Sequence, residues 1–365
     1  MNFHRVLLPL LASAFVPPLF AESEGTLEVE TAAVDEAVLE TVTVIGNARK
    51  ADEVPGSATV VSGETLKSSR VMTTNEALRK APGINVRDEE GFGMRPNIGV
   101  RGLNPTRSTK VLLLEDGLPL AYAPYGDNAS YYHPPIDRFA RVEVLKGSAM
   151  NLYGPQTVGA VINYLTPNPT QEFQGLFSVA GGNRGFLNAR GRMGGEGLLL
   201  DFVRKEGDGA RDFQQSTIED YNLKGVFELS PNQLLIVRAN RFDEDSAVSY
   251  SGLTDAEYAN FGREYNPLRN DTFDAQRYGT SATHELSFGT DDSLTTSVYW
   301  SHFSRDWWRQ ASTVTDSQCN AATYSVDGQK RVQAVPAASV AALQPMLQNA
   351  RAYRDALTEL LASNA

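Results

Sequence analysis

The sequence predicts a compact α+β domain followed by an antiparallel β-sheet of the membrane β-barrel class. Short β-prone segments and one helix signal fill residues 51–167, whereas residues 171–310 hold about seven longer segments that alternate apolar and polar side chains. Connections between the longer segments alternate between short and long, as in outer-membrane barrels. After the N-terminus no apolar run approaches the ~20 residues of a membrane helix, so helical spanning is excluded.

The composition allows a sizeable core and argues against nucleic acid as a partner. The chain has 365 residues, of which 41% are hydrophobic and 9% aromatic, so a disordered chain is not expected. Its formal net charge is −11, whereas phosphate binding needs clustered Lys and Arg. A local group of arginines can still attract an anion into a cleft.

Residues 1–21 have the pattern of a cleaved signal peptide. His4 and Arg5 precede an apolar run, and Leu19-Phe20-Ala21 matches a cleavage site. The other interpretation is a buried N-terminal helix. Export leads to an oxidising compartment, yet Cys319 is the only cysteine, so no disulfide can form within this sequence.

Residues 22–50 are acidic at first and short of large apolar side chains, which predicts a mobile leader. Residues 40–46 then form a β-prone run in polar surroundings. On the residues alone, this run is either an ordinary edge strand or an extended peptide that adds to the sheet of another protein.

Within residues 51–167 the signals alternate between strand and helix. Thr73 and Glu76 have the spacing of a capping box, and Pro82-Gly83 ends the helix that they begin. The expected strands are Ser57–Val61, Ile84–Arg87, Ile98–Arg101, Lys110–Glu115 and Arg141–Leu145.

Within residues 171–310 the strand signals are longer and more regular. Residues 194–197, 230–232 and 289–292 are short turn signals, whereas residues 206–217 and 243–275 are long and polar. Tyr299, Trp300, Trp307 and Trp308 fit either an interfacial aromatic girdle or an aromatic core. The expected strands are Phe173–Val179, Phe186–Met193, Leu198–Lys205, Ile218–Leu229, Gln233–Phe242, Gln276–Phe288 and Leu294–Arg305.

No catalytic constellation is found, so we expect neither enzyme activity nor a metal site. The four histidines show no metal-ligand spacing, and no Gly-x-Ser-x-Gly or Walker motif occurs. His133, beside Pro134 and Pro135, is interpreted as a loop residue.

Three glycine-marked motifs follow one another between Asn97 and Pro167. In this order and spacing they resemble the plug domain of TonB-dependent outer-membrane receptors. The resemblance implies an antiparallel membrane β-barrel of about 22 strands with the α+β plug domain in its lumen, of which about seven strands are present here. The motifs are Ile98-Gly99-Val100-Arg101-Gly102-Leu103-Asn104-Pro105, Val111-Leu112-Leu113-Leu114-Glu115-Asp116-Gly117, and Arg141-Val142-Glu143-Val144-Leu145-Lys146-Gly147 with Tyr153-Gly154-Pro155-Gln156.

The same resemblance assigns the N-terminal run and the C-terminal tail. Residues 40–46 look like a TonB box, whose contacts with TonB would come from Glu40, Thr41, Val42, Thr43 and Val44. Residues 311–365, which end in an Ala/Leu-rich helical stretch, would form an external loop if the chain is the front part of a longer receptor. The alternative is a truncated product that cannot close a barrel.

Within the family the sequence most resembles receptors for ferric dicitrate. The resemblance implies active uptake of a ferric chelate across the outer membrane of a Gram-negative cell, with iron entering only as the chelate and no permanently bound cofactor. Its partners would be TonB, the chelate and outer-membrane lipid. Another siderophore, cobalamin, a passive porin and a non-transporting fragment are the alternatives. The resemblance rests on Gly102-Leu103-Asn104-Pro105, Ala123-Pro124-Tyr125-Gly126, Thr157-Val158-Gly159 and Ser251-Gly252-Leu253-Thr254.

The family also suggests two groups of functional residues. Arg101 and Lys146 end strands where the family has basic residues that lock the plug to barrel carboxylates. The ligand would bind at the tip of the plug and on a barrel strand, because guanidinium groups pair well with carboxylates. The ligand candidates are Met94, Arg95, Arg107, Tyr125 and Arg305.

Overall fold

The computed structural model describes residues 54, 56–89, 92–121, 131–154, 157–249, 252–288 and 292–310. It also gives the backbone of a small three-stranded sheet formed by β15 (Thr315–Asp316), β16 (Tyr324–Val326) and β17 (Val332–Ala334). The predicted signal peptide, leader, TonB box and helical tail lie outside the described residues, as do Tyr125 and Cys319.

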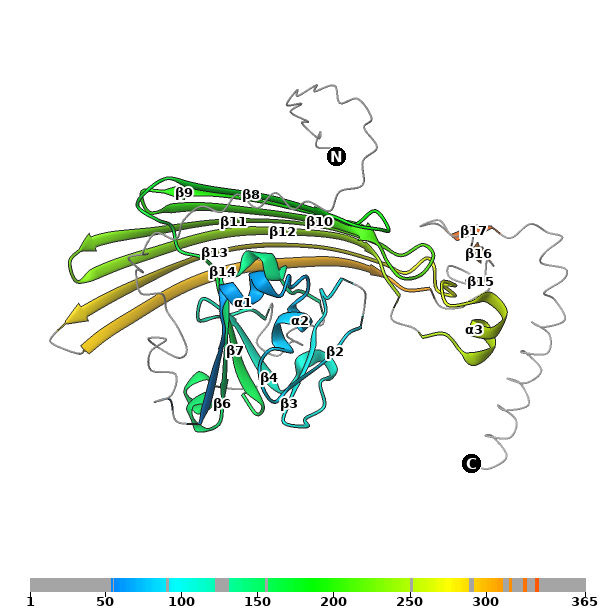
Figure 1. The fold of residues 1–365 in the computed structure, drawn as a ribbon, viewed down its shortest axis with the longest axis horizontal. Helices are drawn as coiled ribbons and strands as arrows, with labels where there is room; N and C mark the ends of the chain where they lie inside the picture. The colour runs from blue at the N-terminus through cyan, green and yellow to red at the C-terminus, as the bar shows by residue number, and fades with distance from the viewer. Residues whose placement is uncertain are drawn as a thin grey trace, which may run out of the picture. The chain divides into compact units, whose positions relative to one another are not determined.

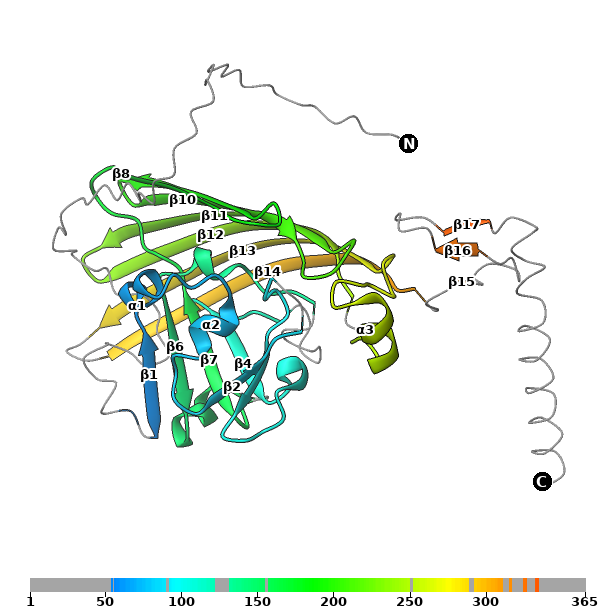
Figure 2. The ribbon, with the colours of Figure 1, turned by 45° about the vertical axis from the view of Figure 1, so that its right-hand side comes forward.

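The first part of the chain is an α+β domain built around a mixed sheet. Five strands lie in the order β1-β6-β7-β4-β5, and β4 runs parallel to β7 while the other pairs are antiparallel. Figure 2 shows β1 at one edge of this sheet, beside α1. The elements are β1 (Ser57–Val61), α1 (Gly63–Ser68), α2 (Thr74–Leu78), β4 (Val111–Glu115), β5 (Leu118–Pro119), β6 (Arg141–Lys146) and β7 (Ala160–Leu165), with the separate hairpin β2 (Ile84–Arg87) and β3 (Asn97–Val100).

The start of α2 agrees with half of the predicted capping box. The Thr73 hydroxyl accepts a hydrogen bond from the Glu76 N–H at 3.2 Å. The Glu76 carboxylate, however, accepts from the Met72 N–H at 2.7 Å instead of reaching back to Thr73. The helix still begins where the sequence predicts, because one capped N–H and an acidic first turn suffice.

The core of this domain lies between its sheet and α2. All six residues of β7 are buried, and β4 and β6 bury most of theirs. The sequence prediction missed β7, because a strand buried on both faces is a continuous apolar run without alternation.

The second part of the chain is a seven-stranded sheet in which every neighbouring pair is antiparallel. All seven predicted strands are confirmed, and several run further than predicted into segments that had been taken for loops. No helix among the described residues is both long and apolar enough to cross a membrane. The strands are β8 (Gln174–Gly181), β9 (Leu187–Gly195), β10 (Leu198–Asp208), β11 (Gln215–Ser230), β12 (Gln233–Ala247), β13 (Thr272–Phe288) and β14 (Asp292–Trp308).

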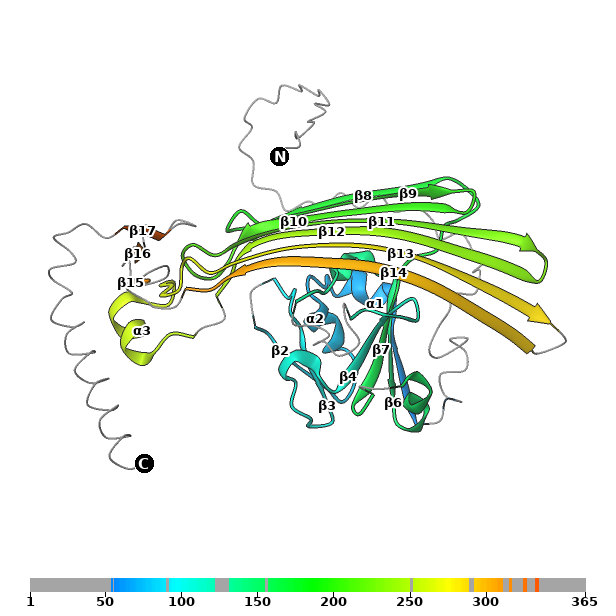
Figure 3. The same cartoon turned by 180° about the vertical axis from the view of Figure 1, so that it is seen from behind.

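Side chains alternate between two faces of this sheet. Figures 1 and 3 show the α+β domain beneath one face, called here the near face. The opposite or far face carries a band of exposed apolar side chains, including Leu223, Val237 and Val298. This band ends at a cross-strand row in which Tyr221, Arg241 and Tyr278 are direct neighbours.

The strand connections differ between the two ends of the sheet. Glu196-Gly197 and residues 231–232 make tight turns at one end, whereas residues 248–271 connect β12 to β13 at the other. That long connection contains α3 (Asp255–Phe261), whose N-terminus has a complete capping box made by Thr254 and Glu257. The long connection between β12 and β13 therefore lies at the end opposite the tight turns, as the sequence predicts, whereas the other predicted long connection is reduced to residues 209–214 because β10 and β11 extend into it.

Candidate functional site

One extended segment of the α+β domain, Tyr131–Arg138, crosses the near face and contacts six of the seven strands. We call it the crossing segment. Pro134 and Pro135 favour an extended backbone before a short 3₁₀ turn at Ile136–Arg138. Almost the whole segment is buried.

The C-terminal half of the crossing segment makes polar contacts. The Asp137 carboxylate accepts a hydrogen bond from the Asn188 amide of β9 at 2.9 Å and pairs with Lys205 of β10. The Arg138 Nε lies 3.0 Å from an Asp220 carboxylate oxygen of β11. Each charged side chain of this half therefore has a partner of opposite sign on the sheet.

The N-terminal half makes aromatic contacts. The Tyr132 ring packs edge-on to Phe242 of β12, with ring centroids 5.1 Å apart. The Arg277 guanidinium of β13 lies 4.7 Å from the same ring. Tyr131 contacts Trp307 of β14 at 5.7 Å. The crossing segment thus spans the sheet from β9 to β14.

Six buried charged residues form an ionic cluster between β4, the crossing segment and the sheet. The Arg138 Nη1 lies 3.2 Å from a Glu115 carboxylate oxygen, and the Arg238 Nη1 lies 2.9 Å from Asp116. Arg238 also pairs with Glu115. The cluster contains three acids and three bases: Glu115, Asp116, Asp220, Arg138, Lys224 and Arg238.

Two carboxylates of the cluster, Glu115 and Asp116, stay ionised despite burial. Burial alone raises the pKa of Glu115, but the nearby Arg138 and Arg238 outweigh it and hold that pKa below its usual value. The pKa of Asp116 is lowered in the same way by Arg238 and Lys224, with help from hydrogen bonds donated by Thr166. Removing one partner of such a buried group leaves an uncompensated charge, which costs about 3–5 kcal/mol.

A second buried ion pair involves a predicted ligand residue. The Arg95 Nη2 lies 2.5 Å from the Glu244 Oε1 of β12, and its guanidinium lies 4.1 Å from the Phe273 ring centroid. Arg95 and Met94 are only 2% and 5% exposed. Their geometry is therefore that of contacts between the domain and the sheet; their predicted ligand role stays a prediction.

The two residues predicted to lock the domain to the sheet lie elsewhere. The Lys146 ammonium donates a hydrogen bond to the Pro82 carbonyl at 2.7 Å. Desolvation and then the like charge of Arg101 lower its pKa. Within the described part of the chain, neither Lys146 nor Arg101 pairs with a carboxylate of the sheet, so this prediction stays open and the ionic cluster makes the observed connection.

Two other predicted ligand residues, Arg107 and Arg305, meet at Tyr131. The Arg305 Cζ lies 3.5 Å from the Tyr131 ring centroid, and the Arg107 Nη1 lies 3.5 Å from the Tyr131 hydroxyl. Arg309 lies 5.5 Å from the Trp307 ring centroid. We call Arg107, Tyr131, Arg305, Trp307 and Arg309 the outer arginine cluster, because it lies at the end of β14 nearest the long connections.

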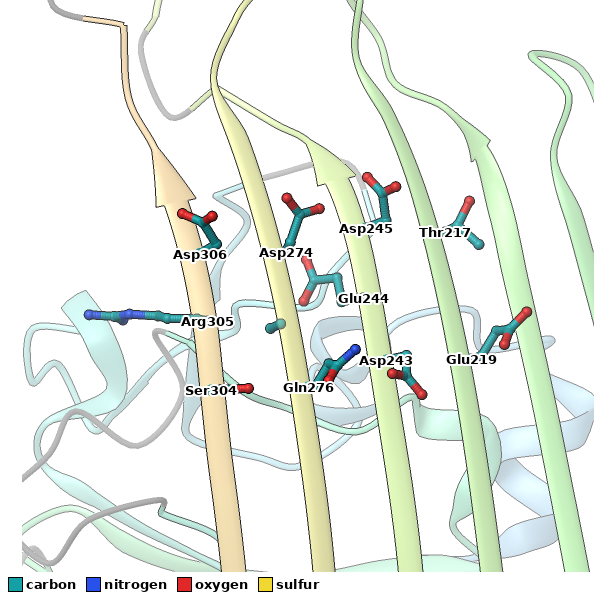
Figure 4. A pocket seen from close by; sticks show the side chains of 11 residues that line it. Thr217, Glu219, Asp243, Glu244, Asp245, Asp274, Gln276, Ser304, Arg305 and Asp306 are labelled. Atoms are coloured by element: carbon teal, nitrogen blue, oxygen red, sulfur yellow. The ribbon is translucent and has the colours of Figure 1, made fainter. Parts of the chain in front are cut away.

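Carboxylates gather on the far face near the same end. Asp245, Asp274 and Asp306 are direct cross-strand neighbours and line a depression of about 530 Å³. Figure 4 shows these three carboxylates in a row across adjacent strands. Glu244 and Arg305, one residue away along their strands, alternate to the near face, where they contact Arg95 and Tyr131.

His133 is part of the buried packing. Its Nδ1 lies 3.3 Å from the Thr74 hydroxyl and 2.8 Å from the Pro134 carbonyl oxygen, and its ring packs edge-on to Tyr164. Burial lowers the pKa of His133 to about 4. The backbone of His133 is that of a loop residue, as predicted, but the burial of its side chain was not predicted.

Comparison with known families explains the α+β domain. The family model described as the TonB-dependent receptor plug domain matches residues 50–161. Residues 50–161 are a TonB-dependent receptor plug domain. The plug comprises β1 to β7 with α1 and α2, and the sheet beside it is accordingly called the barrel sheet.

Proteins of similar sequence are named as a transporter and a receptor. The "Vitamin B12 transporter BtuB" of Vibrio vulnificus is 29% identical over 244 residues, which cover 64% of this chain and 38% of that protein. The "Ferric enterobactin receptor PirA" of Pseudomonas aeruginosa is 30% identical over 173 residues, covering 44% of this chain and 23% of that protein. The chain thus spans well under half the length of these relatives.

The solved structures confirm the predicted fold. The ferric citrate transporter FecA in its unliganded form has a TM-score of 0.64 and 23% identity, over 75% of this chain and 44% of that chain. This similarity covers both the plug and the barrel sheet, because neither alone reaches three quarters of the chain. A plug packed against part of a receptor barrel is therefore the architecture of this chain.

The sequence prediction missed the residues that join plug to barrel sheet. One available signal was the pair Glu115-Asp116, because two adjacent acids directly follow the apolar residues of β4. Another was the run of polar residues at alternate positions of β11, where Asp220, Asn222 and Lys224 all point to the near face. A polar residue on the otherwise apolar face of a strand indicates a buried partner.

Proposed function

We propose that this protein takes up a ferric chelate across the outer membrane, driven by TonB. The observation that carries the proposal is a plug domain joined to the near face of a barrel sheet by the buried ionic cluster. Such a plug blocks passive flow while it stays in place, so transport requires work on the plug. This argues against a passive porin.

The expected sequence of events follows from the geometry. The chelate binds near the end of the sheet that carries the long connections, and binding changes the population of plug conformations. The segment Glu40–Val44 then adds as a strand to TonB, which pulls on the plug. For binding to promote this step, the chelate must bind more tightly to the state that presents the segment.

Citrate or a similar siderophore is the first candidate ligand. The arginines of the outer arginine cluster support a ligand with carboxylate or catecholate oxygens. Cobalamin is the second candidate, because the similarity to a vitamin B12 transporter extends over more of the chain than that to PirA.

The experiment is growth of a strain lacking the gene, under iron limitation, with one ferric chelate supplied at a time. We expect the intact gene to restore growth on one chelate. Val42→Pro should abolish this, because proline removes a main-chain hydrogen bond from the added strand. Ala33→Pro, in the same leader but outside the predicted TonB box, is the matched control and should have no effect.

Growth on cobalamin as the limiting nutrient tests the second candidate with the same variants. If the intact gene restores growth on cobalamin but on none of the ferric chelates, the cargo is cobalamin and not a ferric chelate. Uptake that persists in Val42→Pro would contradict TonB-driven transport altogether.

A further inference from the structure

We propose that Asn222 of β11 makes the plug easier to displace from the barrel sheet. While the plug lies against the sheet, the buried amide of Asn222 has no hydrogen-bond partner among the described residues. Once the plug moves away, water can hydrate this amide. The inference rests on the proposed function, in which TonB must pull on the plug, and it assigns to one barrel residue an effect opposite to that of the ionic cluster.

Asn222 lies in the middle of the contact between the plug and the barrel sheet. It points to the near face, as do Asp220 and Lys224, two positions before and after it on β11. Asp220 pairs with Arg138 of the crossing segment. The Lys224 Nζ donates a hydrogen bond to the Oγ1 of Thr166, directly after β7, at 3.2 Å. Asn222 is only 2% exposed, since the plug is held over it on both sides.

Both polar atoms of the Asn222 side chain are unpaired. Neither its Oδ1 nor its Nδ2 has a hydrogen-bond partner in the part of the chain that the structure describes. The carboxylate of its direct neighbour on β10, Asp201, pairs instead with Arg190 and Arg192. An unpaired buried polar group destabilises the state in which it is buried. Asn222 therefore destabilises the state in which the plug lies against the sheet.

Asn240, the direct neighbour of Asn222 on β12, shows the opposite arrangement. Its Oδ1 accepts a hydrogen bond from the Arg277 Nη1 at 3.0 Å. The Arg277 guanidinium in turn lies over the Tyr132 ring of the crossing segment. Two asparagines of one cross-strand row thus have opposite effects, because Asn240 supports a contact with the plug and Asn222 weakens one.

Displacement of the plug removes the cost of burying Asn222. Once the plug moves away, water reaches this part of the near face and forms hydrogen bonds with the amide. A group that is better solvated in one of two states shifts the equilibrium toward that state, so Asn222 favours the displaced plug. The ionic cluster acts in the opposite direction, because its charges lose their partners when the plug leaves. The balance between these two effects sets the work that TonB must do.

The test replaces Asn222 by leucine, which has a similar volume and no polar group. Hydrogen–deuterium exchange of the purified full-length protein measures how readily the crossing segment separates from the sheet. We expect Asn222→Leu to slow exchange of this segment by at least about 5-fold, the effect of one unpaired buried polar group on an opening equilibrium. Asn222→Val, which suits a strand, should act in the same direction and serves if the leucine variant does not fold.

The matched control is Asn240→Leu. It should accelerate exchange of the crossing segment by at least about 5-fold, because Arg277 loses a hydrogen-bond partner next to the Tyr132 ring. The two substitutions make the same chemical change at neighbouring positions of the sheet. Opposite effects on exchange therefore report the pairing of each amide and not the introduction of leucine.

Uptake of the ferric chelate or cobalamin that supports growth gives a second measurement. Asn222→Leu should lower the maximal TonB-dependent uptake rate by at least about threefold, because the plug is harder to displace. The concentration that half-saturates binding to whole cells should stay within about twofold, since the substitution acts on the plug and not on the bound cargo. A residue that merely supports the fold would not separate these two quantities.

Two results would overturn the inference. One is exchange of the crossing segment that is unchanged or faster in the apolar variants of Asn222, as expected if an ordered water pairs the amide. The other is slower exchange with an unchanged uptake rate. If the intact gene supports no uptake at all, the proposed function fails, while the exchange measurement still decides whether Asn222 weakens the contact.

Discussion

At the scale of single residues, Arg138 is central to the contact between plug and barrel sheet. It lies on the crossing segment, pairs with Glu115 inside the plug and with Asp220 on β11, and its side chain is fully buried. These carboxylates raise its pKa further despite burial, so it stays charged at any pH the protein meets. The plug and the sheet therefore share one buried cation.

Replacing Arg138 by leucine should destabilise the plug by about 3–5 kcal/mol, because Asp220 loses its partner and Glu115 keeps only Arg238. The effect is measured by thermal unfolding of the purified protein, with cleavage of the plug by a protease as the readout. Arg263→Leu is the control, since the Arg263 side chain is 81% exposed and its nearest carboxylate is 3.9 Å away. A change at Arg138 no larger than at Arg263 would contradict the role of the cluster.

His133 should make plug stability depend on pH. Its pKa is about 4 in the folded protein and 6.5 in a model peptide, so the unfolded chain takes up the proton first as the pH falls. The contribution of the neutral His133 ring to the free energy of unfolding is fully present above about pH 6.5. It is lost as the pH falls from 6.5 to 4, and the loss is about 3 kcal/mol at most.

The variant His133→Phe keeps the edge contact with Tyr164 but cannot be protonated. Denaturant unfolding at pH 7 and at pH 4.5 should therefore show a smaller loss in the variant than in the unsubstituted protein. Equal losses in the two proteins would mean that His133 does not carry the pH dependence.

At the scale of elements, the barrel strands carry different kinds of side chain on their two faces. The near face holds the charged partners of the plug, and the far face holds an apolar band that ends at the row of Tyr221, Arg241 and Tyr278. In the proposed membrane setting, this band contacts lipid and the tyrosine row marks an interface.

A charge in the apolar band should therefore cost far more than a charge beyond the row. We expect Val298→Arg to reduce folding into lipid vesicles by about 2–4 kcal/mol. Ser304→Arg, on the same face of the same strand but beyond the row, should cost less than about 1 kcal/mol. Similar values for both would exclude a lipid boundary between them.

The strands and turns could be predicted where they depend on residues that are close together in sequence. Alternation and turn residues predicted all seven barrel strands, and Gly147, in the third glycine-marked motif, lies at a tight position. It has φ 100°, and a Cβ there would lie 3.0 Å from the Gly56 Cα. The strands were predicted too short, because charged residues such as Asp243 and Glu244 were taken for a loop although they extend β12.

The interface was not predictable because its pairs are distant in sequence. Arg238 and Glu115 are 123 positions apart, and Arg95 and Glu244 are 149 apart. The sequence identified Arg107 and Arg305 singly, yet only the fold brings them to one tyrosine. The type of residue led to the prediction of Arg95 as a ligand residue, which stays a prediction, but its burial against β12 and β13 could not be read from the sequence.

At the scale of the whole molecule, the account depends on the plug lying against the near face of the barrel sheet. The crossing segment makes this contact with six strands, from β9 to β14. Both the proposed transport and the proposed role of Asn222 need the plug to remain there until TonB acts.

The most direct measurement is photo-crosslinking from position 132 of the full-length protein in membranes, with a benzophenone amino acid in place of Tyr132. The Tyr132 ring centroid lies 5.1 Å from that of Phe242 and 6.3 Å from that of Phe303. We therefore predict crosslinked peptides from β12 and β14, identified by mass spectrometry. Crosslinks confined to the plug itself or to other proteins, with none to β12 or β14, would contradict the account.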